Sequence, residues 1–283
     1  MENVLAERAM LVNIRVSMWS GRMKDAIVSN EVCANKKAEA DAGAWWTYTV
    51  PKSFINPIEA AGLRVREVNN KLTLPWTDRG LRILPAEAFL DYRTEMAKYI
   101  AIFDEKVQDF LRAYPDIIAT KAERLGGLVA NLPSVDEIKG KFGIYTDIVP
   151  VPTEVKDFRV DIPAEELQKM KDGVNESAKI LATNATKELW KRMGEVVSHI
   201  AEVLGEEKKI FRDTMVTSLK DFCETIRKYN VNECPEVVAV SKEIQETLGK
   251  LKTDDLRENK EEREKAAKEA EEIKKKINGF FGK

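Results

Sequence analysis

The chain is most regular between residues 163 and 204, which read PAEELQKMKDGVNESAKILATNATKELWKRMGEVVSHIAEVL. Apolar residues recur there every three or four positions, from Leu167 to Leu204. That interval places them on one face of an α-helix. Pro163 followed by Glu165 is typical of a helix start, because proline lacks an amide hydrogen and a carboxylate favours the N-terminal end of the helix dipole. We therefore expect a long amphipathic helix, of about six turns or more, that packs in a bundle or coiled coil.

Several other parts of the chain share this helical interval. The most regular of them opens after Pro85 and continues to about Leu111, and Pro115 is expected to kink or end it because proline breaks helical hydrogen bonding. These patterns predict a chain dominated by helices. The expected helices cover residues 23–42, 56–70, 86–111, 117–125, 135–142 and 211–229, with another from about residue 236 onward.

The C-terminal residues 250–276 have a different character, because basic and acidic side chains dominate and apolar ones are few. Glu and Lys residues four positions apart stabilise a helix even when it is isolated, so a helix is expected here too. Such a helix has little apolar surface to bury. We expect it to project into solvent or to meet a partner.

Short strands are expected in the N-terminal half, where runs of β-branched and aromatic residues favour extended backbone. Pro150 and Pro152 limit one of these runs to the edge of a sheet, since proline cannot donate a ladder hydrogen bond. We expect a small sheet that includes the first strand. The runs are residues 10–19, 45–50, 144–151 and 158–162.

These expectations combine into a fold that is mainly α with a small β-sheet in the N-terminal half. Long amphipathic helices follow, and the C-terminal half is coiled-coil-like. Proline and glycine become rarer after Pro163, which suggests a boundary there. The predicted domains are an α+β domain over residues 1–162, a helical bundle or hairpin over 163–249 and a highly charged C-terminal helix over 250–283.

The charges of the chain nearly cancel, since 46 Lys and Arg residues stand against 48 Asp and Glu residues, a net charge of -2. No overall field draws the chain to nucleic acid or to an anionic membrane, so any such binding must be local. Cys33, Cys223 and Cys234 show no disulfide or zinc spacing, which indicates free thiols in a reducing compartment. The sequence shows neither a signal peptide nor a membrane-spanning apolar run. We expect a cytoplasmic protein that does not enter membranes.

Residues able to do chemistry are sparse. His199 is the single histidine, and its place within the predicted helix of residues 163–204 suggests a structural role. No phosphate-binding loop occurs, and Gly126 and Gly127 follow a helical pattern, so we interpret them as a helix end. The many carboxylates fall on faces that we expect to be solvated. The sequence therefore predicts no catalytic residues, no metal site and no cofactor, and we expect a protein that is not an enzyme. A single histidine excludes a histidine-based triad and a polyhistidine metal site, whereas a site made of carboxylates alone stays open.

One stretch, between residues 45 and 82, combines aromatic and basic side chains. Single-stranded nucleic acid binding requires this combination, because bases stack on rings while cations follow the phosphates. The alternative is that the tryptophans lie in the core and the long basic side chains cover them. The candidate nucleic-acid-binding residues are Trp45, Trp46, Lys52, Arg64, Arg66, Lys71, Trp76, Arg79 and Arg82.

A series of short motifs in this order resembles an uncharacterised family of phage and plasmid proteins, a domain of unknown function. The likeness covers about residues 8–165 and extends more loosely into the helical part. The motifs are Leu11-Val12-Asn13-Ile14 with Trp19, Pro51-Lys52, Leu74-Pro75-Trp76, Gly80 with Leu84-Pro85, Tyr92, Leu125-Gly126-Gly127, Phe142-Gly143, Pro150-Val151-Pro152 and Phe158-Arg159-Val160. The resemblance implies no established activity. It implies a bacterial host cytoplasm and a role as adaptor or assembly partner near MoxR-like or CobS-like AAA+ ATPases.

Two functions agree with these observations. The favoured one is a non-enzymatic interaction or assembly protein of a phage or similar mobile element. Its long helices would build a homo-oligomer or dock an AAA+ ATPase. The alternative is a single-stranded nucleic-acid-binding accessory in replication or recombination, which would use the stretch between residues 45 and 82.

Overall fold

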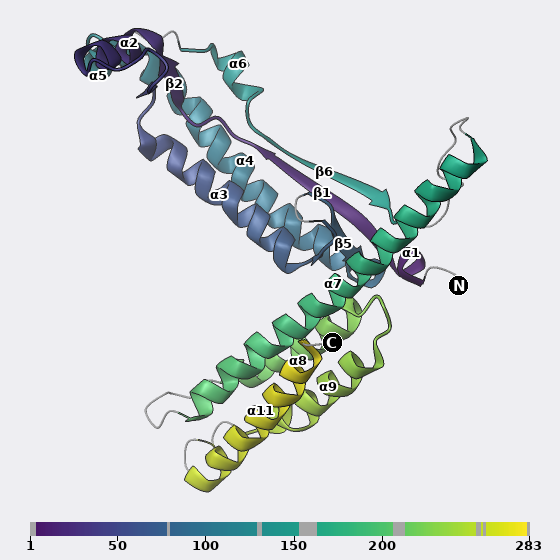
Figure 1. Cartoon of the computed structure of the whole chain (residues 1–283). Coiled ribbons are helices and arrows are strands. Elements are labelled where there is room, and N and C mark those ends of the chain that lie inside the picture. The colour runs from purple at the N-terminus through teal and green to yellow at the C-terminus, as the bar shows by residue number, and fades with distance from the viewer. Residues whose placement is uncertain are drawn as a thin grey trace. The chain divides into compact units, whose positions relative to one another are not determined.

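The computed structural model describes residues 4–77, 80–128, 132–152, 163–205, 213–252, 256 and 259–281 (Figure 1). Most of these residues are helical, and a small antiparallel sheet of four strands belongs to the N-terminal half of the chain. The predicted fold class, mainly α with a small N-terminal sheet and long helices, is confirmed.

The strands form two sheets. They are β1 (Ala9–Ser17), β2 (Arg22–Asp25), β3 (Trp45–Tyr48), β4 (Leu74–Pro75), β5 (Arg82–Pro85) and β6 (Gly143–Pro150). The larger sheet has the order β4-β5-β1-β6, in which β1 pairs antiparallel with β5 from Ala9 opposite Pro85 to Val12 opposite Arg82. The smaller sheet joins β2 and β3 alone, also antiparallel.

Three of the predicted strands are present as β1, β3 and β6, and β6 lies at a sheet edge as its prolines predict. The predicted strand over residues 158–162 lies outside the described residues. The sequence does not predict β4 and β5, because the residues around them are typical of turns. Their extended backbone depends on pairing with each other and with β1, which is distant in sequence.

The helix predicted over residues 23–42 is wrong in extent, because residues 22–25 pair with β3 as a strand and the helix covers only residues 26–35. Apart from this helix, and from a short one over residues 4–8 that the sequence does not predict, the helices agree with the predicted ones in order and nearly in extent. They are α1 (Val4–Arg8), α2 (Ala26–Asn35), α3 (Lys52–Lys71), α4 (Phe89–Ala119), α5 (Lys121–Leu125), α6 (Val135–Lys139), α7 (Ala164–Gly205), α8 (Asp213–Tyr229), α9 (Pro235–Glu246) and α11 (Lys260–Phe281), with 3-10 turns η1 (Ala86–Ala88) and η3 (Leu248–Lys250). α4 continues four residues past Pro115, where the sequence predicts an end or a kink. Pro115 itself is exposed, while Tyr114 and Ile117 beside it are buried and hold this turn against the core.

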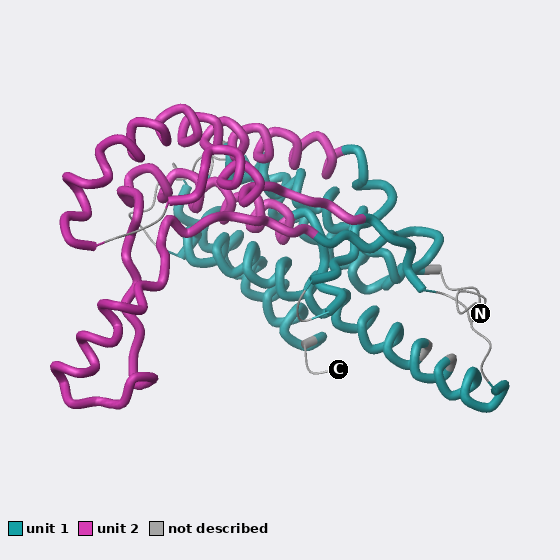
Figure 2. The backbone as a smooth tube through the Cα atoms, turned by 90° about the horizontal axis from the view of Figure 1, so that it is seen from above, with its two compact units in different colours: residues 1–13, 72–90, 148–283 teal, residues 14–71, 91–147 magenta. Residues whose placement is uncertain are grey.

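Contacts divide the chain into two compact units, which Figure 2 shows in different colours. Unit 1 comprises residues 1–13, 72–90 and 148–283, and unit 2 comprises residues 14–71 and 91–147. The chain passes between the units within β1, after α3, within α4 and within β6, so each unit is assembled from separate segments. The predicted domains 1–162, 163–249 and 250–283 are continuous segments, and this division stays a prediction.

In unit 2, the helices α3 and α4 run side by side (Figure 1). The Tyr92 hydroxyl on α4 donates a buried hydrogen bond to Asn69 Oδ1 on α3, over 2.8 Å. Beyond the end of β1, Trp19 packs on Phe110 and Tyr114 of α4, with ring centroids 6.2 Å apart in both pairs. These large buried rings form the core of the unit.

Unit 1 is a bundle of α7, α8, α9 and α11 together with the paired parts of β1, β4 and β5. The buried side chains of the four helices recur at the helical interval that the sequence predicts. They include Leu189, Met193, Val197 and Ile200 on α7, Leu219, Cys223 and Ile226 on α8, Val237, Val240 and Ile244 on α9, and Ala266, Ala270, Ile273 and Ile277 on α11.

The charged helix α11 does not project into solvent, and in this respect the expectation from its composition is wrong. α11 packs along α7, and Ala266, Ala270, Ile273 and Ile277 are almost completely buried. These four residues are three or four positions apart, and two of them are alanines, which let two helices approach closely. A narrow apolar stripe is therefore enough to pack the helix, while its many charged side chains remain outside.

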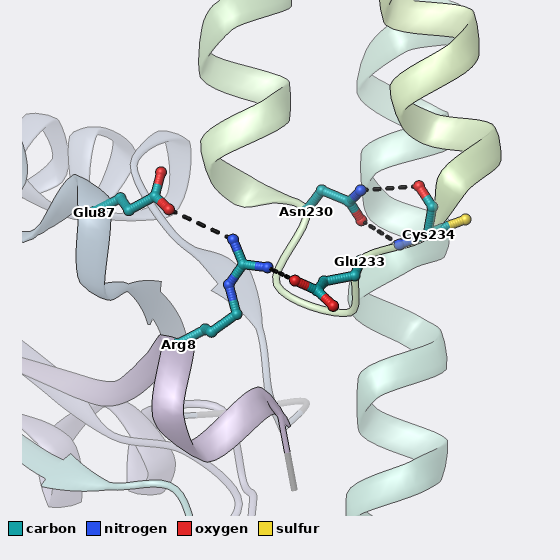
Figure 3. Close-up of polar contacts among 5 residues, drawn as sticks. All are labelled: Arg8, Glu87, Asn230, Glu233 and Cys234. Atoms are coloured by element: carbon teal, nitrogen blue, oxygen red, sulfur yellow. Dashed lines mark hydrogen bonds and ion pairs between the residues drawn. The ribbon is translucent and has the colours of Figure 1, made fainter.

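A polar cluster in unit 1 ties the N-terminal helix to the loop between α8 and α9 (Figure 3). The Arg8 guanidinium contacts the carboxylates of Glu87, at 3.4 Å, and of Glu233. Glu233 has a left-handed backbone, with φ of 52°. The Asn230 side chain stabilises this loop, because its amide bonds both the N–H and the C=O of Cys234, over 3.0 and 2.9 Å.

Candidate nucleic-acid interface

The antiparallel pair of β2 and β3 is connected through α2, and we call this pair the hairpin. It begins at Gly21, whose backbone has φ of +67°. The Gly21 carbonyl accepts hydrogen bonds from the Thr49 N–H at 2.9 Å and from the Thr49 hydroxyl at 3.0 Å. A Cβ atom at position 21 would lie 2.7 Å from Val50 Cγ2 and 2.9 Å from Ile55 Cγ1. Only glycine fits both the backbone angle and the space, so this residue fixes the base of the hairpin.

The register of the hairpin gathers two cations and two aromatic rings on one face. Arg22 lies opposite Tyr48, and Lys24 lies opposite Trp46. Residues opposite each other in an antiparallel pair share a face, and residues two apart on one strand do so as well. All four side chains are exposed. We call this set the aromatic–cationic face.

The opposite face of the hairpin is held by α2. Thr47 is buried there, and its hydroxyl lies 3.5 Å from Asp25 Oδ2. Asp25 also caps α2, because its Oδ1 accepts from the Val28 N–H at 3.0 Å. The Ser29 hydroxyl of α2 accepts from the Trp45 N–H at 2.9 Å. These contacts fix which face of the hairpin packs and which face remains open.

Each ring of the aromatic–cationic face has a cation over it. The Arg22 guanidinium lies 5.1 Å from the centroid of the Trp46 ring, and the Lys52 ammonium lies 4.2 Å from the centroid of the Tyr48 ring. Trp46 is 46% exposed and Tyr48 is 38% exposed. Cation–π pairs at exposed sites are worth about 0.5–1 kcal/mol, so the cations can leave the rings when a stronger partner arrives.

A residue from α5 supports the hairpin from outside. Arg124 Nη1 donates to the Tyr48 carbonyl over 2.6 Å. This bond holds the backbone of β3 and places a further cation near the aromatic–cationic face. The sequence gives no signal for it, because the two residues are 76 positions apart.

The structure brings together only some of the nine predicted residues. Trp46 belongs to the aromatic–cationic face, and Lys52 lies over the Tyr48 ring of that face. Trp45 is equally exposed, at 46%, but alternation along the strand places it on the other face. Arg22 and Lys24 of the same face, and Arg124 beside it, are not among the predicted residues. The sequence gives no signal for Arg22 and Lys24, because their run is expected to begin a helix and they meet Trp46 and Tyr48 only through the antiparallel register.

Three other predicted cations lie along α3. Arg64 Nη1 donates to Glu67 Oε2 over 2.9 Å, and this hydrogen bond is the main reason why the pKa of Arg64 is raised. Arg66 Nη2 donates to the Val16 carbonyl over 3.1 Å. Lys71 is the last residue of the helix, whereas Lys52 is the first. At about 1.5 Å per residue, Arg64, Arg66 and Lys71 lie about 18 to 29 Å along the helix from Lys52, which contacts the hairpin.

The remaining predicted residues belong to unit 1 or are not described. Trp76 is buried, with 7% of its surface exposed, which agrees with the core interpretation for this tryptophan alone. Arg82 Nε donates to the Thr73 hydroxyl over 2.6 Å. Burial, and then the neighbouring Arg192, lower the pKa of Arg82. Arg79 lies outside the described residues. The core interpretation therefore holds for Trp76, whereas Trp45 and Trp46 lie at the surface.

Within the described ranges, no three His, Cys, Asp or Glu side chains gather closely enough to hold a metal ion. None of the described helices has the length and apolar character that crossing a membrane requires.

Comparison with known proteins adds no relative. Neither the family models, the curated proteins nor the solved structures contain a match to this chain. The resemblance to the uncharacterised phage and plasmid family therefore stays a prediction, as does the partnership with an AAA+ ATPase that it implies.

Proposed function

We propose that the protein is a non-enzymatic binding protein that holds single-stranded nucleic acid on its aromatic–cationic face. The observation that carries the proposal is the exposure of Trp46 and Tyr48 beside Arg22, Lys24 and Lys52. Exposed rings accept bases by stacking, and neighbouring cations hold phosphates. This arrangement suits a strand whose bases are unpaired, because the bases of a duplex are not free to stack on a protein ring.

The balance of charge at the face supports an anionic ligand. Asp25 is the acid of the β2–β3 ladder, and its carboxylate is engaged in capping α2 on the opposite side of the hairpin. The cations can therefore act on a ligand although the whole chain carries a net charge of -2. If three cations contact phosphates, the logarithm of the binding constant is expected to fall by about 2 for each tenfold rise in salt concentration.

Fluorescence anisotropy with a labelled oligothymidylate tests the proposal on the full chain. Trp46→Ala is expected to weaken binding about tenfold or more, since stacking of one base on an aromatic side chain is worth about 1–3 kcal/mol. Arg22→Ala is expected to weaken binding and to lower the salt slope by about 0.7, which is the contribution of one phosphate contact.

The matched control is Tyr145→Ala on β6. Tyr145 is also exposed and also has a guanidinium over its ring, that of Arg15 at 5.4 Å. Arg15 is paired with Asp147 at 3.5 Å, however, so this pair offers no unbalanced cation. Oligonucleotide binding that is absent at low salt, or that Tyr145→Ala reduces as much as Trp46→Ala does, contradicts the proposal.

A second function, assembly through α7, has an observation of its own. None of the described side chains of α7 before Ala185 is buried, although Leu167, Val174 and Leu181 continue the apolar interval of the helix. Met170 on the same line is 41% exposed. We propose that this first half of α7 pairs with a second copy of the chain.

Light scattering after size-exclusion chromatography measures this association. A discrete oligomer is expected for the native chain, and Met170→Glu is expected to shift it toward the monomer because a buried unpaired carboxylate is costly at an interface. Ile180→Glu is the control, since Ile180 is exposed on the same helix but off the apolar line. A native chain that is monomeric at high protein concentration excludes this second function.

A further inference from the structure

The spacing of the two rings restricts the conformation of a bound strand. Trp46 and Tyr48 are alternate residues of β3 and project from the same face. A β-strand rises about 3.3 Å per residue, so side chains two residues apart leave the backbone about 6.6 Å apart. The rings therefore form two separate platforms, each large enough for one base.

A stacked strand does not fit two platforms at this distance. Neighbouring bases of a helical strand are about 3.4 Å apart along the axis. If one base covers Trp46, the next base of such a strand reaches only about halfway to Tyr48. Two neighbouring bases cover both rings only when the strand is drawn out to about twice its helical rise, which breaks the stacking between them.

The cations repeat at the same interval as the rings. Arg22 and Lys24 are alternate residues of β2, one opposite Tyr48 and the other opposite Trp46. Both are exposed, and Arg22 and Lys52 lie over rings that a base would cover. A base that takes a ring displaces its cation, which is then free to meet a phosphate. In an extended strand, successive phosphates are far enough apart for each of them to contact a different cation.

Resting on the proposed function, we infer that the ligand is an extended, unstacked single strand, with neighbouring bases on Trp46 and Tyr48. Its chemical class is pyrimidine-rich, because thymine and uracil strands stack weakly and extend readily. Adenine strands stack on themselves and must first be pulled apart. The discrimination comes from strand flexibility and needs no hydrogen bond to a base edge.

The experiment compares labelled oligothymidylate, oligoadenylate of the same sugar and length, and their duplex, all on the full chain at low salt. Oligothymidylate is expected to bind about threefold to tenfold more tightly than oligoadenylate, and the duplex more weakly than either strand. Binding of oligouridylate is measured as well, and its affinity relative to oligothymidylate shows whether the chain prefers RNA or DNA. Tighter binding of oligouridylate than of ribo-oligoadenylate supports the same inference, because the preference depends on the bases and not on the sugar.

Variants connect the preference to the two rings. Trp46→Phe retains a flat ring and is expected to retain the preference for oligothymidylate. Trp46→Ala leaves one platform, so a stacked strand then fits as well as an extended one and the preference is expected to disappear. Both variants change an exposed side chain, so the fold of the hairpin is expected to survive.

The outcomes separate this inference from the proposed function. Equal or tighter binding of oligoadenylate, or a preference that Trp46→Ala leaves unchanged, overturns the inference while nucleic-acid binding stands. A chain that binds none of the strands overturns the proposed function and the inference with it.

Discussion

The indole ring of Trp190 stacks on the phenyl ring of Phe280, with centroids 4.5 Å apart and planes 12° from parallel. Trp190 is buried on α7, and Phe280 lies in the last turn of α11. Stacked aromatic pairs contribute about 0.5–1.5 kcal/mol beyond the area that they bury. This pair therefore holds the C-terminal end of the charged helix on α7, where alanines and isoleucines hold the rest.

Replacing Phe280 by alanine removes the stack. We expect the free energy of unfolding to fall by about 1–3 kcal/mol, measured by chemical denaturation, because both the pair and its buried area are lost. Gly279→Ala is the control in the neighbouring position. A Cβ atom there meets nothing within 4 Å, so the helix should gain up to about 1 kcal/mol. A loss in both variants would contradict the role assigned to the ring.

The base of the hairpin should be sensitive to Gly21→Ala. The new methyl group meets Val50 and Ile55, and the left-handed backbone is unfavourable for alanine, so a loss of about 1–3 kcal/mol is expected in thermal or chemical denaturation. Gly43→Ala is the matched control, since its Cβ meets nothing within 4 Å. If the two variants are equally stable, Gly21 does not fix the base of the hairpin.

Arg192 of α7 should contribute to stability through two hydrogen bonds. Its Nε donates to Glu188 Oε1 at 3.0 Å, and its Nη2 donates to the Thr73 carbonyl at 2.7 Å. Both charged side chains are at most a quarter exposed. Arg192→Ala leaves these acceptors without that donor, and we expect a loss of about 2 kcal/mol in denaturation.

The control for Arg192 is the adjacent cation. Lys191 lies 4.0 Å from Glu195, and both side chains are well exposed. Exposed pairs are worth little, so Lys191→Ala should change the free energy of unfolding by less than about 0.5 kcal/mol. Similar losses for the two variants would show that burial of the Arg192 pair has no special effect.

Stability should decline at alkaline pH. Burial raises the pKa of Tyr92 to about 12, and burial, aided by the carboxylate of Glu137, raises the pKa of Tyr114 to about 12. An unfolded tyrosine has a pKa of about 10, so the unfolded chain releases these protons first. The stabilising contribution is complete below about pH 10 and is lost as the pH rises toward 12.

Chemical denaturation at a series of pH values measures this decline. Tyr92→Phe is expected to reduce the slope between about pH 10 and 12, since one of the two buried phenols no longer titrates. The same variant should cost about 1 kcal/mol at neutral pH, because the hydrogen bond to Asn69 Oδ1 is lost. An unchanged alkaline slope in this variant would refute the role of Tyr92.

Much of the candidate site could not be predicted from the sequence. The composition of residues 45–82 indicates rings and cations, but it assigns Trp45, Trp46 and Trp76 to the same group. Trp76 is buried in unit 1, whereas Trp46 is exposed on the hairpin of unit 2. Arg22 precedes that stretch, and it joins Trp46 only through the antiparallel register. Pairing between strands depends on contacts outside the local pattern, so composition alone cannot choose the face.

The sequence by itself determines the long amphipathic helices, because their apolar interval is a local property that any helical backbone must satisfy. It likewise determines the edge position of β6, since proline removes a donor wherever the strand lies. It does not determine α2, whose predicted first residues form β2 through pairing with β3. The tertiary structure alone decides that α11 packs on α7. A stripe of Ala266, Ala270, Ile273 and Ile277 stabilises a helix only when another helix matches it, and no local rule provides that partner. The exposure of Trp46 is decided in the same way, by what the rest of the chain leaves uncovered.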